Sequence, residues 1–165
     1  MNLNDQETVT GEITKTIAKC FQLRIIDLSG VKGIDEAGLG NIVKGSIEPK
    51  EFGEKATLVG LQYLTSLKLN TLDKIFDSSI VNILRACPNM QQLELNKCEN
   101  VSEFLFEAIT NQKVAPNLKY LDINMIKNIK ADPLEEFRWA NPKLIVRRFM
   151  FQEAPPKDNG LWRPL

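Results

Sequence analysis

The sequence of 165 residues contains no histidine, and that absence excludes several kinds of chemistry. Without histidine there is no Ser–His or Cys–His nucleophile pair, no imidazole proton shuttle near neutral pH and no histidine-bearing metal site. Net charge is lacking too, because 21 Lys and Arg balance 21 Asp and Glu. No overall field therefore attracts nucleic acid or an acidic membrane surface. We expect neither of these among the partners.

Cysteine is scarce, and long apolar runs are missing. Cys20, Cys87 and Cys98 are an odd number without a CxxC pair, so a reducing compartment is favoured over a disulfide framework. No apolar stretch approaches the roughly 18 residues that a membrane-spanning helix needs. The polar start MNLNDQETVTGEIT lacks the blocks of a secretory signal. We expect an intracellular, cytoplasmic protein without direct membrane insertion, with cilium, nucleus and mitochondrion left open.

What the sequence does contain is an internal repeat. Segments of the form apolar-x-x-Leu-x-apolar begin at Leu64, Met90 and Leu118, and a shorter one begins at Leu144, so that the starts are 26, 28 and 26 residues apart. An earlier copy begins at Leu23, one period plus about 15 residues before Leu64. The extra residues fall at about 45–60, where glycines, a proline and charges predict an exposed loop.

In the first half of each repeat the apolar residues alternate with a spacing of two residues, which predicts a short strand. In the second half they are three to five residues apart, which predicts a helix. Asp35, Asp77, Ser102 and Asp132 stand where helix N-caps are expected, and Asp132 is followed by Pro133. One strand–helix unit cannot bury both of its apolar faces, whereas stacked units share a continuous core. The fold class predicted from the spacing is therefore α/β.

The segment from Met90 to Val101, with Cys98 at the motif cysteine, and the helix end Ala-Cys87-Pro88-Asn89 resemble the cysteine-containing subfamily of leucine-rich repeat proteins. The resemblance implies a right-handed strand–helix horseshoe, a solenoid of about four repeats, over residues 23–148. Residues 1–22 would form an N-terminal helical cap and 149–165 an extended tail. The subfamily includes F-box proteins, small proteins resembling coupling factor B of ATP synthase, and subunits of ciliary complexes. The roughly 20 residues before the first repeat are too few for an F-box.

Strand geometry predicts the candidate binding residues. If the leucines point inward, the residues that flank the last two point onto a concave sheet face. The predicted partner-binding residues on this face are Ile25, Asp27, Lys68, Asn70, Gln92, Glu94, Asn96, Tyr120, Asp122 and Asn124, with Ser29 and Ser66 in the same rows. Tyr120 is the strongest single anchor, because interfaces draw much of their energy from such residues. The alternative is that these rows form only a solvated sheet face.

The end of the sequence, Leu161-Trp162-Arg163-Pro164-Leu165, has no repeat left to cap. Trp162 and Arg163 either fold back onto the repeats or anchor the chain in another protein. No cofactor is expected, because the glycine-bearing stretch at 40–46 lacks the lysine of a phosphate loop. No metal site and no small-molecule substrate are evident.

The sequence thus predicts a non-catalytic protein–protein interaction module, a scaffold or structural subunit of a larger assembly. The alternative is the substrate-recognition part of an F-box-type ubiquitin ligase whose F-box lies outside this chain. A third interpretation is an enzyme that uses Cys98 or a carboxylate. The alternative interpretation of Cys87 and Cys98 is that they are small apolar residues that pack in the core.

Overall fold

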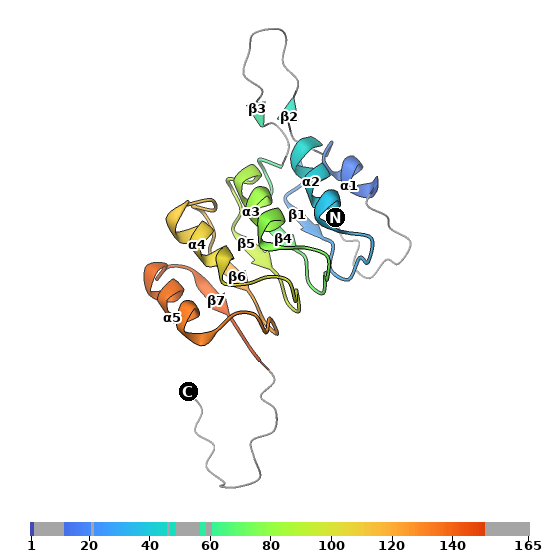
Figure 1. The fold of residues 1–165 in the computed structure, drawn as a ribbon. Helices are drawn as coiled ribbons and strands as arrows, with labels where there is room; N and C mark the ends of the chain where they lie inside the picture. The colour runs from blue at the N-terminus through green and yellow to red at the C-terminus, as the bar shows by residue number, and fades with distance from the viewer. Residues whose placement is uncertain (2–11, 21, 46, 49–56, 59–60, 151–165) are drawn as a thin grey trace, which may run out of the picture.

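A computed structural model describes residues 1, 12–20, 22–45, 47–48, 57–58 and 61–150. These residues form five helices and seven strands (Figure 1). The helices are α1 (Glu12–Ile17), α2 (Glu36–Gly45), α3 (Asp77–Ala86), α4 (Phe104–Asn111) and α5 (Ala131–Ala140). The strands are β1 (Ile25–Asp27), β2 (Ile47–Glu48), β3 (Thr57–Leu58), β4 (Ser66–Lys68), β5 (Gln92–Glu94), β6 (Tyr120–Asp122) and β7 (Ile145–Arg147). None of the described helices is long and apolar enough to cross a membrane.

Five of the strands form one parallel sheet in the order β1-β4-β5-β6-β7. Helices α2 to α5 lie side by side along one face of this sheet (Figure 1). The insertion after α2 contains the short antiparallel pair β2–β3, in which the backbones of Ile47 and Leu58 pair. The strand–helix alternation that the spacing predicts is therefore the architecture of the chain.

The sheet register follows the repeat. Ile26, Leu67, Leu93 and Leu121 are the middle residues of their strands; they pair in one row and are at most 1% exposed. The next apolar residue of each motif is buried as well; these are Leu28, Leu69, Leu95 and Ile123. A one-residue slip of any strand would turn its leucine from the core to solvent, so the hydrophobic pattern fixes the register.

Asparagine side chains join successive repeats at the edge where helices lead into strands. Asn89 Nδ2 donates to the backbone oxygen of Gln62 (2.7 Å), and Asn117 Nδ2 donates to that of Pro88 (3.0 Å). In both repeats the asparagine after the proline thus satisfies a carbonyl of the preceding repeat. Pro88 also follows the C-cap of α3 directly, whereas α4 already ends at Asn111, before Pro116.

The helix starts differ in part from the N-caps that the sequence predicts. Asp35 does accept a hydrogen bond from the Gly38 N–H (2.8 Å) at the start of α2. Helix α5, however, begins at Ala131 with Lys130 as N-cap, so Asp132 is not the cap. Asp77 is the first residue of α3, and its carboxylate binds the backbone N–H and the hydroxyl of Ser102 in the next repeat (3.0 and 2.7 Å). The N-cap of α4 is Glu103, so the predicted caps Asp132, Asp77 and Ser102 are all wrong.

A left-handed backbone residue follows the strand in four successive repeats. Gly30, Thr71, Lys97 and Met125 have φ values of 70°, 59°, 58° and 61°. Glycine adopts this conformation without a Cβ penalty, whereas the β-branched threonine does so at the greatest cost. The first repeat therefore carries the residue that suits the turn, and the second carries the least suitable one.

We predict that Thr71→Gly raises the free energy of unfolding by about 0.5–1 kcal/mol, because relief of the left-handed strain exceeds the entropy that glycine adds to the unfolded chain. Urea denaturation followed by circular dichroism measures the change. The matched variant Gly30→Ala should lower stability by about 1 kcal/mol at the equivalent position. Destabilisation by Thr71→Gly would contradict the prediction.

Candidate functional site: the open sheet face

The face of the large sheet opposite the helices, here called the open face, carries two rows of side chains in register. The first row is Ile25, Ser66, Gln92, Tyr120 and Ile145. The second row is Asp27, Lys68, Glu94, Asp122 and Arg147. The structure thus brings the strand residues predicted from the sequence together on one face.

Charges in the second row are largely paired with each other. Lys68 Nζ lies 2.9 Å from Glu94 Oε1, and Asn70 Nδ2 donates to the other carboxylate oxygen of Glu94 (3.2 Å). The hydrogen bond to Glu94 raises the pKa of Lys68, although burial acts in the opposite direction. Lys68 and Glu94 therefore largely neutralise each other's charge on this face.

Asp122 is the most enclosed member of the second row, with an exposed fraction of 3%. Its Oδ2 accepts a hydrogen bond from the Tyr120 hydroxyl (3.2 Å) and lies 3.9 Å from Arg147 Nη1, and its Oδ1 accepts from the Asn124 N–H (3.1 Å). A partner would therefore meet Tyr120 and Arg147 before it meets this carboxylate. Asp122 positions its neighbours on the face.

The predicted binding residues after the strands serve mainly the turns between repeats. Asn96 N–H donates to Asn70 Oδ1 (2.8 Å), and Asn70 N–H donates to the Ser29 hydroxyl (3.3 Å). The ladder stops at the next repeat, because Asn124 N–H donates to Asp122 instead. The Asn96 and Asn124 Oδ1 atoms are accordingly buried without a partner among the described residues.

The apolar residues accessible on the open face lie at its two ends. Ile25 on β1 is 54% exposed and Ile145 on β7 is 65% exposed. Tyr120 lies between them, half-buried. Ile145 and Arg147 were not predicted from the sequence. The signal for them was the motif that begins at Leu144, 26 residues after the one at Leu118. Trp162 and Arg163 lie outside the described residues.

Two of the cysteines are core residues. Burial raises the pKa of Cys87 to about 12 and that of Cys98 to about 11, and the Cys98 thiol donates to the Leu69 backbone oxygen (3.0 Å). Cys20 is exposed. In the described part of the chain, no three Cys, Asp or Glu side chains are grouped so that they could hold a metal ion.

No protein-family model matches the sequence, and no curated protein matches it either. Several solved structures match it in three dimensions, and two of them are described here. Actin-binding site 2 of leiomodin-1 gives a TM-score of 0.59 at 16% identity, over 85% of this chain and 74% of the other. The Rad7–Elc1 complex in yeast gives 0.54 at 16% identity, over 91% of this chain. Together with the parallel sheet and its one-sided helices, these matches decide the architecture. The fold is leucine-rich-repeat-like.

At 16% identity, the similarity to these two structures concerns the fold alone. This chain spans 43% of the chain it matches in the Rad7–Elc1 structure. The two neighbours are an actin-binding site and a member of a protein complex, as their names state. They are thus protein-binding modules.

Proposed function

We propose that the chain is a non-catalytic, intracellular protein-binding module of the leucine-rich repeat type, a short solenoid of the cysteine-containing kind, which serves as a scaffold or subunit of a larger assembly. The observation that carries the proposal is the open face, where five strands hold two side-chain rows in register. The role of the two fold neighbours as protein-binding modules supports it.

Ile25, Tyr120 and Ile145 are the proposed anchors. Burying an aliphatic side chain stabilises a complex by up to about 1.5–3 kcal/mol, and a few such residues carry most of an interface's energy. The paired charges of Lys68, Glu94, Asp122 and Arg147 lie in the neighbouring row, where they would orient a partner of complementary charge.

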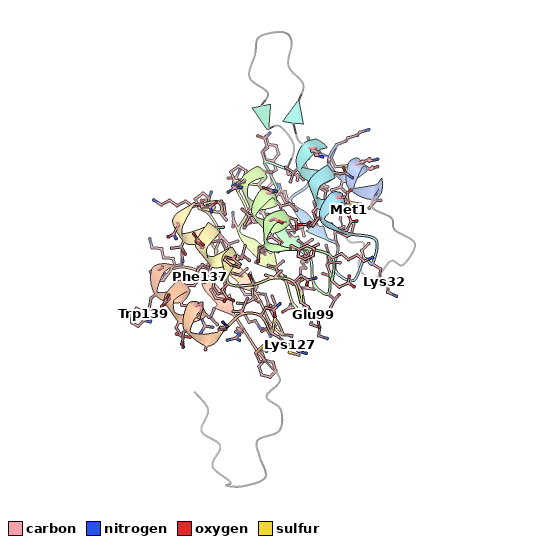
Figure 2. All side chains as sticks on the ribbon, viewed as in Figure 1. Met1, Lys32, Glu99, Lys127, Phe137 and Trp139 are labelled. Carbon is pink, nitrogen blue, oxygen red and sulfur yellow. The ribbon has the colours of Figure 1, made fainter. Side chains whose placement is uncertain are left out.

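Three variants test the proposal. We expect Ile25→Ser and Ile145→Ser each to weaken binding to the native partner about tenfold, because each removes an exposed apolar anchor. The matched control is Trp139→Ser, since Trp139 is 84% exposed but projects from the helix side (Figure 2). Affinity capture from the native source with mass spectrometry identifies the partner, and titration with the purified partner measures the dissociation constant.

If Trp139→Ser abolishes binding while both isoleucine variants retain it, the binding face is the helix side and the proposal fails. A second candidate is substrate recognition for an F-box-type ubiquitin ligase, the alternative that the sequence leaves open. Recovery of a cullin-type ligase together with varying substrates would support this candidate over a fixed subunit.

A further inference from the structure

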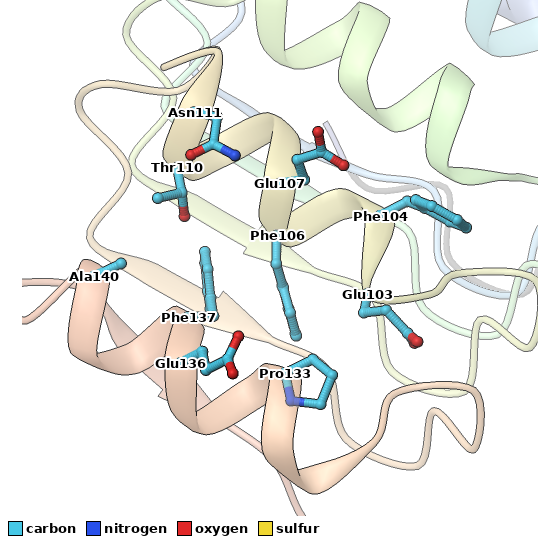
Figure 3. A pocket seen from close by; sticks show the side chains of 10 residues that line it. All are labelled: Glu103, Phe104, Phe106, Glu107, Thr110, Asn111, Pro133, Glu136, Phe137 and Ala140. Carbon is cyan, nitrogen blue, oxygen red and sulfur yellow. The ribbon is translucent and has the colours of Figure 1, made fainter.

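A groove of about 390 Å³ runs between α4 and α5, on the side of the molecule that carries the helices. Its floor is an aromatic pair: the rings of Phe106 and Phe137 are stacked with centroids 4.3 Å apart and planes inclined by 10°. Pro133 lies at one end of the groove and Ala140 at the other (Figure 3). The floor of the groove is therefore apolar.

The rim of this groove is acidic. Glu103, Glu107 and Glu136 are three of the ten residues that line it, and no lysine or arginine is among the ten. None of these carboxylates forms an ion pair with a residue that the structure describes. Uncompensated carboxylates beside an apolar floor favour an occupant with a cation next to an aromatic or aliphatic group.

The chain itself contains such a group, and its described part ends shortly after β7, the strand that follows α5. The last described residues follow β7, where the Arg148 guanidinium donates to the Ile129 backbone oxygen, just before α5 begins. From Met150, twelve residues lead to Trp162. Twelve extended residues span up to about 40 Å, whereas the ten residues of α5 span about 15 Å. The connection is long enough to reach any part of the groove.

We propose that Trp162 and Arg163 of the C-terminal segment occupy the α4–α5 groove of the same chain. The indole packs beside the aromatic pair, and the guanidinium binds between Glu107 and Glu136. Linkage within one chain gives an effective concentration of about 1 mM, so a contact with a dissociation constant of about 0.1 mM is formed roughly nine-tenths of the time. The groove uses no open-face residue, so this inference is independent of the proposed function.

Tryptophan fluorescence tests the proposal in the full-length chain. Trp139→Phe leaves Trp162 as the single tryptophan, because the sequence contains two. In this background we expect Trp162 emission to be blue-shifted and acrylamide quenching to be several-fold weaker than in the urea-unfolded chain. Both differences should decrease at high salt, because the ionic contacts lie near the surface.

Variants in the same background locate the contact. Glu107→Gln with Glu136→Gln, and separately Arg163→Ala, should raise quenching to the level of the unfolded chain. The matched control pair, Asp73→Asn with Glu99→Gln, removes two exposed carboxylates outside the groove and should leave quenching unchanged. Adding Arg163→Ala to the glutamine pair should have no further effect, because both changes remove the same interaction.

Three results would overturn the inference. The first is quenching in the native chain equal to that in the unfolded chain, which would mean that Trp162 is solvated. The second is protection that persists in the glutamine pair, which would place the indole elsewhere. The third is protection that increases with protein concentration, which would mean that the segment docks on a second copy.

Discussion

Replacing Leu95 with alanine is expected to lower the free energy of unfolding by about 3–5 kcal/mol. Leu95 is fully buried and follows β5 in the middle of the sheet, with Leu69 and Ile123 at the equivalent positions on either side. Each repeat of a stacked fold is stabilised mainly by its neighbours, so a cavity at Leu95 weakens the interfaces on both sides. Urea denaturation followed by far-ultraviolet circular dichroism measures the loss.

The control for this prediction is Gln92→Ala on the same strand. Gln92 is exposed on the open face, and we expect its replacement to change stability by no more than about 0.5 kcal/mol. The contrast depends on the alternation of side chains along β5 and on its register with the neighbouring strands. Similar destabilisation by the two variants would contradict the assignment of Leu95 to the core and Gln92 to solvent.

The strand–helix architecture could be predicted because the residues that specify each strand and helix lie close together in the sequence and recur in every repeat. The row Ile26, Leu67, Leu93 and Leu121 was visible in the sequence as one motif with a nearly constant period. Period two places the flanking residues on the opposite face, so Gln92 and Glu94 could be assigned to the open face without knowledge of the three-dimensional structure.

The parts that could not be predicted depend on contacts between repeats. Asp122 belongs to the row of outward residues, but it is buried because Tyr120 and Arg147 cover it, and Arg147 comes from the next strand. Asp77 has the residue type of an N-cap, yet its carboxylate binds Ser102 of the following repeat. The residue type shows that an aspartate can cap its own helix, but it does not show that a residue of the next repeat will bind the same carboxylate instead.

The outward residues of the last strand, Ile145 and Arg147, were missed for a related reason. Residues after Leu144 lose the helical half of the motif, so the segment has no second half to confirm it. Pairing with β6 nevertheless places Ile145 opposite Tyr120 and Arg147 opposite Asp122. Residues 145–147 form a strand because β6 leaves backbone groups free to pair with them. That pairing depends on the tertiary structure and cannot be inferred from the local sequence.

The buried thiols predict a specific dependence of stability on pH. Cys87 and Cys98 keep their protons in the folded chain up to pKa values of about 12 and 11, against an ordinary value of 9.0. Above pH 9 the unfolded chain therefore binds fewer protons than the folded one, and stability falls as pH rises. Each thiol contributes a loss of about 1.4 kcal/mol per pH unit until its folded pKa is reached. Cys98→Ala should reduce this slope in urea denaturation at pH 9–11.

Alkylation kinetics test the non-catalytic interpretation most directly. At pH 8 a maleimide or iodoacetamide probe is expected to label Cys20 rapidly in the native chain, because Cys20 is exposed. Cys98, whose pKa lies two units above the ordinary value, has about a hundredfold smaller thiolate fraction and no solvent access, so its labelling should require unfolding. Cys20→Ser should abolish the rapid phase, and mass spectrometry assigns each labelled residue. A catalytic cysteine needs an accessible thiolate, so protection of Cys98 in the native chain would exclude it as a nucleophile, whereas its rapid native labelling would contradict its place in the core.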